Sequence, residues 1–565
     1  MKLFVFSLAW AFALLASSVA SAATVDHTFK VQNMTIKRLC KEQVIVAVNG
    51  QFPGPTINVN EGDTVIVHVL NEGPYNITIH WHGLFQFLSA WADGPEYVTQ
   101  CTISPRNKYT YKFNVTQQEG TLWWHAHASY LRATVHGAFI IHPRSGQYPF
   151  PKPDDQIPLI LGDWYNSNVE DITAEAQATG GSPTTSNAFT INGLSGDLFN
   201  CSKKDIQDES KAMLRMINAA LNYDLFFKIA NHNFTVVAVD ASYTDRYVTD
   251  VIVIAPGQSA DVLFTANQPN GSYYMVASPY VVGLSEFNKN ATRGIVVYQD
   301  APPSSQPVMP ILPPFDDNET VFKFYSNVTS KVGAPHWVPV PRKVDEHMFI
   351  TIGFNLDFCD PKNVTNGTCQ GPFGQRFSAS MNNESFVAPT GKGLSMLEAF
   401  YKNVSGVYTA DFPDNPPLNY SFTDPDTAMN KSLLFAPKST KVKRLKFNST
   451  VEIVFQDTAL LGGQNHPMHI HGFSFHVLAQ GFGNFNSTTD VEKFNLVNPQ
   501  IRNTIGVPVG GWAVIIFQAN SPGVWLVHCH MEDHVPWGLA MTFEVENGPT
   551  PSTSLPPPPP DLPKC

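Results

Sequence analysis

Histidines separated by a single residue recur along the chain, and this spacing could build a metal site. In a β-strand, residues i and i+2 point to the same side, so each His-x-His pair offers two imidazoles in one direction. Imidazole binds copper, zinc, iron and nickel alike. Ten of the eighteen histidines fall into four clusters, each containing one His-x-His pair, and the four pairs together would form a histidine box. The clusters are His80/His82, His125/His127, His466/His469/His471 and His528/His530/His534.

Cys529 lies between two of these histidines and narrows the choice of metal. In a strand, its sulfur would face away from the imidazoles of His528 and His530. It could then bind a second site together with His466 and His534. Two histidines and one thiolate are the ligands of blue-copper electron-transfer sites. The sequence therefore predicts a blue-copper site and a histidine box that share one short backbone segment.

The paired spacing also separates candidate ligands from ordinary histidines. One His-x-His pair in a strand is usually core or surface chemistry, whereas four pairs, two of them in repeated Gly-x-x-x-x-His-x-His frames, indicate a metal. The other eight histidines lie outside these pairs, and we assign them no metal. They are His27, His68, His136, His142, His232, His336, His347 and His476.

The elements that would position these ligands repeat along the chain. A glycine precedes the histidine pair by five residues in a first block (Gly120, His125) and in a last block (Gly523, His528). A middle block carries Val276 at the equivalent position, so its histidines are missing. The simplest explanation is three related β-sandwich domains, with the ligand-free middle domain as a spacer.

The composition agrees with an all-β protein. Aromatic residues make up 12% and charged residues 15% of the 565 residues, and there are 44 Pro and 37 Gly. Such a chain is typical of short strands and turns rather than helix bundles. The net charge of −11, without a long basic run, argues against nucleic acid or an anionic membrane surface as the partner.

We expect five segments along the chain. They are a signal peptide (1–22), a first domain with half of the histidine box (23–148), a ligand-free middle domain (149–305), a third domain with the blue copper and the other half-box (306–549), and a Pro-rich tail (550–565). We expect the tail to be non-folded and held at its end if Cys565 is bridged.

The N-terminus predicts export. Lys2 is the only charge before a nearly continuous apolar run, and Ala20-Ser21-Ala22 resembles a cleavage site. The run is too short to span a bilayer, and no later apolar run of 18 residues exists, so we expect no membrane anchor. Seventeen Asn-x-Ser/Thr acceptors predict N-glycans.

The seven cysteines fit an oxidising compartment, and their odd number leaves one free thiol. Cys529 lies in a histidine motif, so six cysteines remain to pair, and fifteen connectivities are open. Short spacing alone suggests a local Cys359–Cys369 bridge.

These motifs resemble those of the multicopper oxidases, and plant-type laccases in particular. The matching segments are His80-Trp-His-Gly83, Trp124-His-Ala-His127, His466-Pro-Met-His-Ile-His471 and His528-Cys-His-Met-Glu-Asp-His534. The resemblance covers essentially the whole mature chain. It implies three cupredoxin-like Greek-key β-sandwich domains and four copper ions, one of type 1, one of type 2 and two of type 3. It also implies Cys101–Cys565 and Cys40–Cys201 disulfides.

The resemblance assigns each ligand. The blue type 1 copper would take His466, Cys529 and His534, the type 2 copper His80 and His469, and the type 3 pair His82, His125, His127, His471, His528 and His530. Leu539 would occupy the axial position of the blue copper, where ascorbate oxidases carry Met. An aliphatic side chain cannot coordinate, so we expect a higher reduction potential than with a thioether.

The implied activity is that of a secreted laccase of the apoplast or cell wall. Phenolic donors such as monolignols or flavonoids would bind near His466 or His534 and lose one electron each. Electrons would pass through Cys529 to His528 and His530, and four would reduce O2 to water. Lignin or phenolic polymerisation would be the outcome, and we expect a monomer.

Two carboxylates could supply the protons that O2 reduction consumes. Asp93 and Glu532 match acidic positions that related oxidases use in this way. The alternative is a turn-forming Asp and a solvated Glu.

Other functions remain open. An ascorbate oxidase or a metal-ion oxidase would share the copper ligands. A non-enzymatic cell-wall protein of this fold would be expected to lack them. A copper-storage or carrier protein would have no reason to join a thiolate site to a histidine box.

Overall fold

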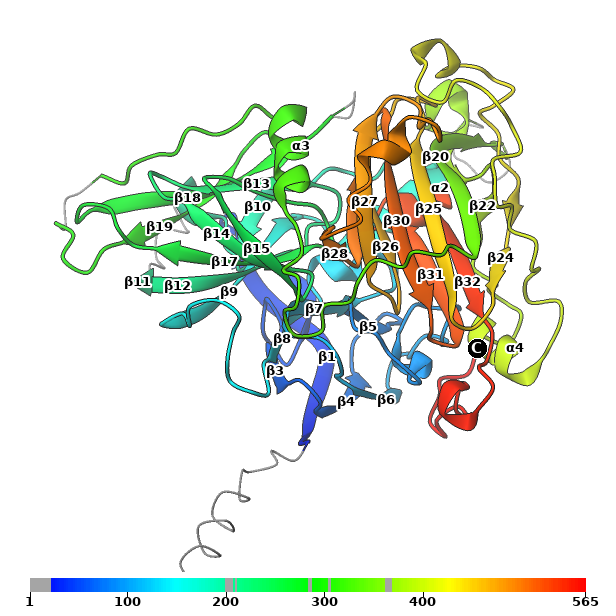
Figure 1. Cartoon of the computed structure of the whole chain (residues 1–565), viewed down its shortest axis with the longest axis horizontal. Helices are drawn as coiled ribbons and strands as arrows, with labels where there is room; N and C mark the ends of the chain where they lie inside the picture. The colour runs from blue at the N-terminus through cyan, green and yellow to red at the C-terminus, as the bar shows by residue number, and fades with distance from the viewer. Residues whose placement is uncertain (1–21, 199–206, 209–210, 283–286, 303–305, 361–367) are drawn as a thin grey trace, which may run out of the picture.

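The computed structural model describes residues 22–198, 207–208, 211–282, 287–302, 306–360 and 368–565. The predicted signal peptide lies almost entirely outside these residues, as does Cys201, the predicted partner of Cys40. The described chain is built mainly of strands, which confirms the predicted all-β class (Figure 1).

Two four-stranded sheets form the first domain and enclose a common apolar core. One, ordered β2-β1-β4-β6, contains β1 (Thr24–Arg38), β2 (Lys41–Val48), β4 (Thr64–Asn71) and β6 (Lys108–Asn114). The other, ordered β3-β8-β7-β5, contains β3 (Ile57–Asn60), β5 (Ile79–His82), β7 (Gly120–Ala126) and β8 (His136–His142).

The middle domain pairs a six-stranded with a five-stranded sheet. The first, ordered β10-β9-β12-β17-β14-β15, contains β9 (Asp155–Trp164), β10 (Ala188–Ile191), β12 (Lys211–Asn218), β14 (Phe234–Val239), β15 (Ser242–Thr249) and β17 (Ser259–Thr265). The second, ordered β11-β19-β18-β13-β16, contains β11 (Gln207–Asp208), β13 (Asp224–Ile229), β16 (Ile252–Ile254), β18 (Ser272–Tyr280) and β19 (Thr292–Val297).

The third domain follows the same plan. Its six-stranded sheet, ordered β21-β20-β25-β30-β27-β28, contains β20 (Glu346–Asp357), β21 (Arg376–Met381), β25 (Ser449–Asp457), β27 (Phe475–Phe482), β28 (Ile501–Arg502) and β30 (Gly511–Ala519). Its five-stranded sheet, ordered β24-β32-β31-β26-β29, contains β24 (Val442–Leu445), β26 (His466–Ile470), β29 (Thr504–Val507), β31 (Gly523–Cys529) and β32 (Ala540–Val545). A small pair joins β22 (Ser385–Phe386) to β23 (Lys438–Ser439).

The three domains share one topology. Each contains a parallel pair in its first sheet, namely β1–β4, β9–β12 and β20–β25. Each contains a second parallel pair in its other sheet, namely β3–β8, β11–β19 and β24–β32. Six non-local pairings in corresponding places are the structural counterpart of the repeat seen in the sequence, including the middle block.

Burial differs between ordinary strands and those that carry the histidines. Along β4, Val65, Val67 and Val69 are buried and alternate with half-buried residues, as expected for a strand with one face on a core. By contrast, β7 and β31 are buried along their whole length. One face of each packs on its own core, and the other faces the junction between domains.

The glycines of the repeated frame let the domains approach each other. Gly120 has φ +132°, and a Cβ there would lie 2.9 Å from Cα of Ala241 in the middle domain. Gly523 has φ +143°, and a Cβ there would lie 3.1 Å from Cβ of Ala90 in the first domain. Both positions combine a backbone conformation that favours glycine with a close interdomain contact.

Few helices accompany the sheets, and one of them bears on the domain boundary predicted at 305. The α-helices of the described residues are α2 (Val169–Thr179), α3 (Asn318–Asn327), α4 (Met396–Lys402) and α5 (His534–Trp537). Helix α3 packs on the middle domain, where Phe324 contacts the ring of Tyr247. The first strand of the third domain begins only at Glu346.

No helix among the described residues is long and apolar enough to cross a membrane.

The Pro-rich tail is packed, which corrects our expectation of a non-folded segment. Trp91 Nε1 donates to the carbonyl oxygen of Pro556 at 2.9 Å, and the carboxylate of Asp561 accepts from the Thr110 amide at 3.0 Å. Leu562 packs against the apolar cores. Apolar and hydrogen-bonding contacts with the first domain therefore order the tail along its length.

The disulfides implied by the resemblance and by spacing are present where the structure describes both partners. Cys101 is bonded to Cys565 and Cys359 to Cys369, and Cys529 is the free cysteine in the described part of the chain. The first bridge joins the first domain to the tail that follows the third domain.

This bridge predicts a measurable difference in stability. Replacing Cys101 and Cys565 by Ser should destabilise the protein by about 2–4 kcal/mol, because the bond closes a very long loop. Replacing Cys359 and Cys369 by Ser opens a loop spanning only 10 residues and should lower the apparent Tm less. Thermal unfolding monitored by circular dichroism compares the pairs, and an equal or larger effect of the second pair would contradict this account.

Candidate metal centre

The four histidine clusters meet at the junction of the first and third domains. In the first domain, His80 on β5 pairs with His125 on β7. In the third, His469 on β26 pairs with His528 on β31. Both half-sites therefore use the same register of two antiparallel strands. The structure brings together all eleven residues predicted from the sequence as metal ligands.

Their ligand atoms form four groups in which every atom lies within 4.8 Å of the others. The groups are His80/His469/His471, His80/His82/His125, His127/His471/His528 and His466/Cys529/His534. His530 adjoins the second group, since its Nε2 lies 3.1 Å from Nδ1 of His82. Two of the groups combine histidines from both domains, so neither domain holds the box alone.

In several of these histidines, a hydrogen bond from one ring nitrogen orients the ring and leaves the other nitrogen without a hydrogen-bond partner among the described residues. Nδ1 of His80 donates to the carbonyl oxygen of Asp93 at 2.7 Å, and Nδ1 of His469 donates to that of Asn503 at 2.8 Å. Nε2 then carries no proton. The Nε2 atoms of His80, His125 and His469 are buried without a hydrogen-bond partner among the described residues. Unpaired buried nitrogens are costly, and a bound cation would satisfy them, so the box fits a metal cluster.

Electrostatics favour the form of histidine that binds metal. Burial lowers the pKa of most rings in the box, and repulsion from neighbouring imidazoles or from Arg132 lowers it further. Burial lowers the pKa of His528 to about 3. Neutral imidazole is the ligand form, so the box needs no proton release near neutral pH. The rings whose pKa lies well below its usual range are His82, His125, His127, His469, His471 and His530.

Asp93 joins the two half-boxes. It caps the short helix η1 (Ala90–Ala92) and is fully buried. One carboxylate oxygen accepts from Nδ1 of His471 at 3.0 Å, and the other lies 3.4 Å from Nδ1 of His80. A single carboxylate thus orients one imidazole from each domain, which places Asp93 directly against two candidate ligands.

The second site lies behind β31, as strand alternation predicts. Sγ of Cys529 lies 3.2 Å from Nδ1 of His534 and 3.7 Å from Nδ1 of His466. Burial raises the pKa of the Cys529 thiol, so a cation is needed to hold it as a thiolate. Two imidazoles around a buried sulfur fit a blue copper.

The residues around this second site constrain both of its histidines. Leu539, at the predicted axial position, is fully buried, and its amide donates to the carbonyl oxygen of His534 at 2.9 Å. The Cys529 amide donates to the carbonyl oxygen of Leu539 at 3.2 Å. Nε2 of His466 lies 3.3 Å from the buried carboxylate of Asp457.

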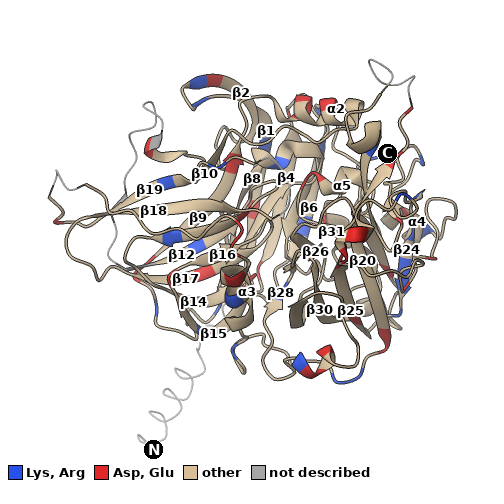
Figure 2. Ribbon diagram, turned by 90° about the horizontal axis from the view of Figure 1, so that it is seen from above, with Lys and Arg blue, Asp and Glu red and all other residues tan. Residues whose placement is uncertain are grey.

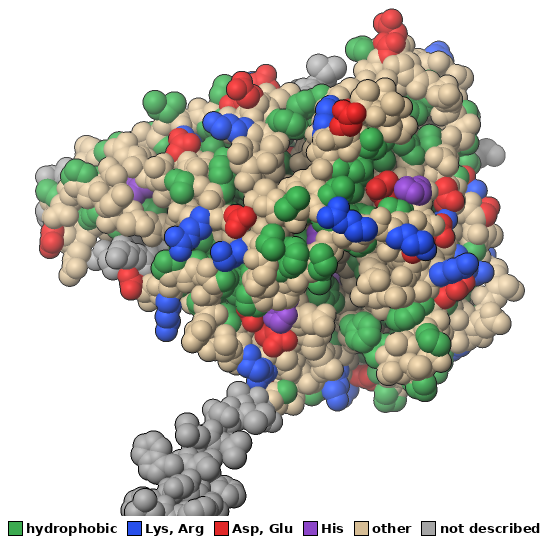
Figure 3. Space-filling model, in the orientation of Figure 1, with side chains coloured by type: hydrophobic (Ala, Val, Ile, Leu, Met, Phe, Trp, Pro, Cys, Tyr) green, Lys and Arg blue, Asp and Glu red, His purple; other side chains and the backbone are tan. Residues whose placement is uncertain are grey.

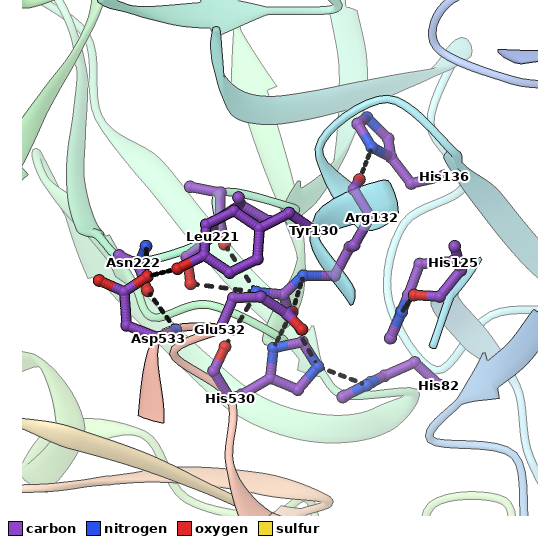
Figure 4. Close-up of polar contacts among 12 residues, drawn as sticks. His82, His125, Tyr130, Arg132, His136, Leu221, Asn222, His530, Glu532 and Asp533 are labelled. Carbon is purple, nitrogen blue, oxygen red and sulfur yellow. Dashed lines mark hydrogen bonds and ion pairs between the residues drawn. The ribbon is translucent and has the colours of Figure 1, made fainter. Parts of the chain in front are cut away.

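Arg132 is a site residue that the sequence did not reveal (Figure 4). It belongs to η2 (Ser129–Ala133) in the first domain and is 1% exposed. Its guanidinium contacts the imidazole of His530 and donates to the carbonyl oxygens of His530 at 3.1 Å and Leu221 at 3.0 Å. It also forms an ion pair with Glu532 at 3.1 Å. Glu532 is therefore paired beside a candidate ligand and is not a freely solvated carboxylate.

All three domains meet at this arginine. Asp533, next to Glu532, accepts hydrogen bonds from the hydroxyl of Tyr130 and from Nδ2 of Asn222, the latter at 2.7 Å (Figure 4). Tyr130 lies in the first domain and Asn222 in the middle domain. Lone arginines have no spacing pattern, so no sequence signal pointed to this network.

A cavity of about 610 Å³ opens beside His534. Phe354 and Trp537 form aromatic walls, with ring centroids 4.9 and 5.5 Å from that of His534. Asp224 of the middle domain also lines it. Nε2 of His466 faces the buried carboxylate of Asp457, whereas His534 lines the cavity. Of the two histidines predicted to lie next to the donor, His534 is therefore the one beside the cavity.

Asp224 brings an unusual carboxyl group to this cavity. It is 2% exposed, and Nδ2 of Asn465 donates to one of its oxygens. The other oxygen, Oδ1, is buried without a hydrogen-bond partner in the described chain. Burial raises the pKa of Asp224 to about 7. The cavity thus contains an acceptor that could take a proton near neutral pH.

Comparisons with known proteins agree with this geometry. Three family models described as multicopper oxidase match residues 30–146, 155–301 and 411–549. The chain is 56% identical to Laccase-7 of Arabidopsis thaliana, with 97% of each chain covered. It is 51% identical to Laccase-24 of Oryza sativa subsp. japonica, over 98% of this chain and 97% of the relative.

Solved structures show the same architecture. The laccase from Botrytis aclada superposes with a TM-score of 0.72 at 27% identity, covering 95% of this chain and 89% of that one. Fet3p, a multicopper oxidase that functions in iron import, also gives a TM-score of 0.72, covering 92% and 90% of the two chains. Its 22% identity supports a shared fold only.

Asp93 offers a direct test of the box. Asp93→Asn keeps the shape of the side chain but removes the charge between His80 and His471. We expect O2 consumption to fall by about 10–100-fold, the usual cost of losing such a partner, while the blue absorption band stays. Oxygen-electrode assays and absorption spectra of the copper-loaded protein measure both.

Asp63→Asn serves as the control. Asp63 is buried in the same domain but pairs with Arg144. Equal loss of oxygen uptake and of blue absorbance in the Asp93 variant would instead indicate a general structural role.

Proposed function

The chain belongs to the multicopper oxidase family and is an oxidoreductase of the laccase type, and from that premise we propose that it oxidises small phenols in the cavity beside His534 and reduces O2 at the histidine box. The convergence of the eleven predicted ligands from two distant parts of the chain carries this proposal. The cavity against His534 gives the donor its place.

We propose four copper ions, held by the residues that the resemblance implied. His466, Cys529 and His534 would hold the type 1 copper, His80 and His469 the type 2 copper, and His82, His125, His127, His471, His528 and His530 the type 3 pair. The buried, unpartnered Nε2 atoms and the buried thiol support this assignment. When bound, these coppers would supply the one-electron oxidation of the donor and the four-electron reduction of O2.

The protein's own groups would bind and deprotonate the phenol. A phenol ring can pack against Phe354 and Trp537 with its hydroxyl towards Asp224. Ionised Asp224 can accept a hydrogen bond from that hydroxyl and take its proton as the phenol loses an electron. Phe377 also lines the cavity and stacks on Trp537, with ring centroids 4.8 Å apart.

At the box, the chain would hold the ligands and exclude water. Asp93 fixes rings from both domains, and Arg132 fixes the segment around His530. We propose Asp93 and Glu532 as the nearest carboxylates for the protons that O2 reduction consumes. Their positions against candidate ligands support this role.

Other donors fit the cavity less well. Asp224 and Asp533 both line it, and two carboxylates disfavour an anionic donor such as ascorbate. A site for Fe(II) would need several oxygen ligands around one point, whereas these walls are largely aromatic. Turnover on a phenol, ascorbate and Fe(II) compares the three activities in one assay.

We also propose that the protein is a secreted, N-glycosylated monomer that acts on phenols of the cell wall, including lignin precursors. The two disulfides and the seventeen glycosylation acceptors support an oxidising, extracellular setting. The signal-like N-terminus supports export but lies outside the described residues.

The metal content tests the assignment first. The copper-loaded protein should be blue and hold about four coppers, and Cys529→Ser should lose the colour and about one copper, because only the thiolate site is altered. Absorption spectra and metal analysis measure both. A colourless wild-type protein, or about one metal per molecule, would contradict the proposal.

Asp224 tests the donor site. Below its pKa of about 7 the carboxyl is protonated and cannot accept the phenol's proton, so kcat/KM for a phenol should rise as pH increases through 7. Asp224→Asn should flatten this rise and lower kcat/KM by about 10²-fold. Ferrocyanide loses an electron without a proton and is the control donor; because it is an anion, removing the charge of Asp224 should not lower its kcat/KM. Equal losses with both donors would rule out proton acceptance by Asp224.

A further inference from the structure

We propose that the ligand-free middle domain positions the histidine box through Asp240, which holds the backbone that orients a histidine of each half-box. This inference rests on the proposed role of His82 and His469 as ligands. It replaces the view of the middle domain as a spacer with that of a third structural part of the metal centre.

Asn503, between β28 and β29, and Thr504, the first residue of β29, contact both half-boxes. Oγ1 of Thr504 lies 3.1 Å from Nδ1 of His469 and 3.1 Å from Nε2 of His82. The neighbouring Asn503 accepts from Nδ1 of His469 through its carbonyl oxygen at 2.8 Å and contacts Nε2 of His82 through Oδ1 at 3.1 Å. Two consecutive residues therefore set the rotation of one imidazole from each domain.

The middle domain holds this segment by its amides. One carboxylate oxygen of Asp240 accepts from the amides of Asn503 at 3.3 Å and Thr504 at 3.4 Å. The other accepts from the amide of Ser259 at 2.9 Å and lies 3.5 Å from Arg502. Asp240 is 1% exposed. A buried carboxylate that gathers several donors is a strong and directional anchor.

The same domain also holds the carbonyl side of the segment. Nε2 of Gln258 donates to the carbonyl oxygen of Thr504 at 2.9 Å, and the hydroxyl of Tyr325 donates to Oε1 of Gln258 at 2.9 Å. Both the amide and the carbonyl oxygen of Thr504 are therefore fixed from outside the third domain's sheets. Sliding of Thr504 relative to the histidines would break hydrogen bonds at both ends.

An adjacent turn of the middle domain packs directly on a third candidate ligand. Gly257 has φ +91°, and a Cβ there would lie 2.9 Å from the ring of His530. Its carbonyl oxygen accepts from Nε1 of Trp123 at 3.2 Å. Gly257 thus lies against His530, Gln258 holds the carbonyl oxygen of Thr504 and Ser259 donates to Asp240, so Asp240 acts within an extended interface.

Asp240→Asn is the sharpest variant for this inference. Asp240 has φ +46°, a region that Asn tolerates, so the backbone need not move. The amide keeps the size of the side chain but loses the charge, and its NH2 group cannot accept from backbone amides. The orientation of His469 and His82 should loosen while the blue site, on the other side of β31, keeps its geometry.

The test uses the full-length, copper-loaded protein and a chelator such as EDTA. Asp240→Asn should release the copper at His80 and His469 about 10–100-fold more readily than wild type, the cost expected for an outer partner of a metal ligand. Electron paramagnetic resonance should show an altered type 2 signal, while the blue absorption band is unchanged. These readouts do not depend on turnover.

Asp261→Asn is the matched control. Asp261 is a buried middle-domain carboxylate that also pairs with a buried arginine, Arg215, at 3.3 Å. Its partners, Arg215 and Thr121, are not among the groups that orient the histidine rings. This variant should keep the type 2 signal and the chelator resistance of wild type. Equal copper release from the two variants would overturn the inference, as would retention within twofold of wild type in Asp240→Asn.

Thr504→Val supplies an independent check, because it removes the hydroxyl between the two rings at nearly constant volume. If Asp240 acts through Thr504, copper release from the double variant should fall well short of the product of the two single effects. Independent, multiplicative effects would also overturn the inference. A wild-type protein that lacks the blue colour or the full metal content would instead contradict the proposed function itself.

Discussion

The structure depends on one constraint: imidazole nitrogens are buried at a domain junction with no hydrogen-bond partner in the described part of the protein. His80, His125 and His469 each use one nitrogen to anchor the ring and leave the other bare. Such an arrangement is costly unless a cation occupies the centre. Because the histidines come from two domains, the metal and the interdomain contact stabilise each other. Folding, assembly and metal binding are therefore parts of one equilibrium.

Strand alternation explains how one short segment can serve two centres. At the end of β31, His528 and the following residue His530 face the box, while Cys529 faces His466 and His534 on the other side. The register of β31 against β26 places His528 opposite His469. The same geometry in β5 and β7 pairs His80 with His125. A duplicated pair of strands thus carries the histidines of the box or ends directly before them, and the last domain adds the thiolate together with His466 and His534.

The sequence was informative wherever chemistry followed a local period. The His-x-His pairs, the inverted orientation of Cys529 and the glycine frame are set by spacings of two to five residues, and the structure places them as expected. Arg132 and His530, by contrast, are 398 residues apart and share no pattern. Asp240, Asn503 and Thr504 meet through backbone amides, which any residue type could supply. The order in the tail also escaped prediction, since it comes from contacts with Trp91 and Thr110 rather than from its own composition.

The Cys101–Cys565 bond has a consequence for biosynthesis. Its partners are 464 residues apart, so the sulfurs cannot meet until nearly all of the intervening polypeptide has left the ribosome. The first domain can complete its own sheets much earlier. A nascent chain would therefore display one half of a metal-binding surface for most of its translation. The covalent strap would then act as a latch, closing only on chains whose distant modules had already docked.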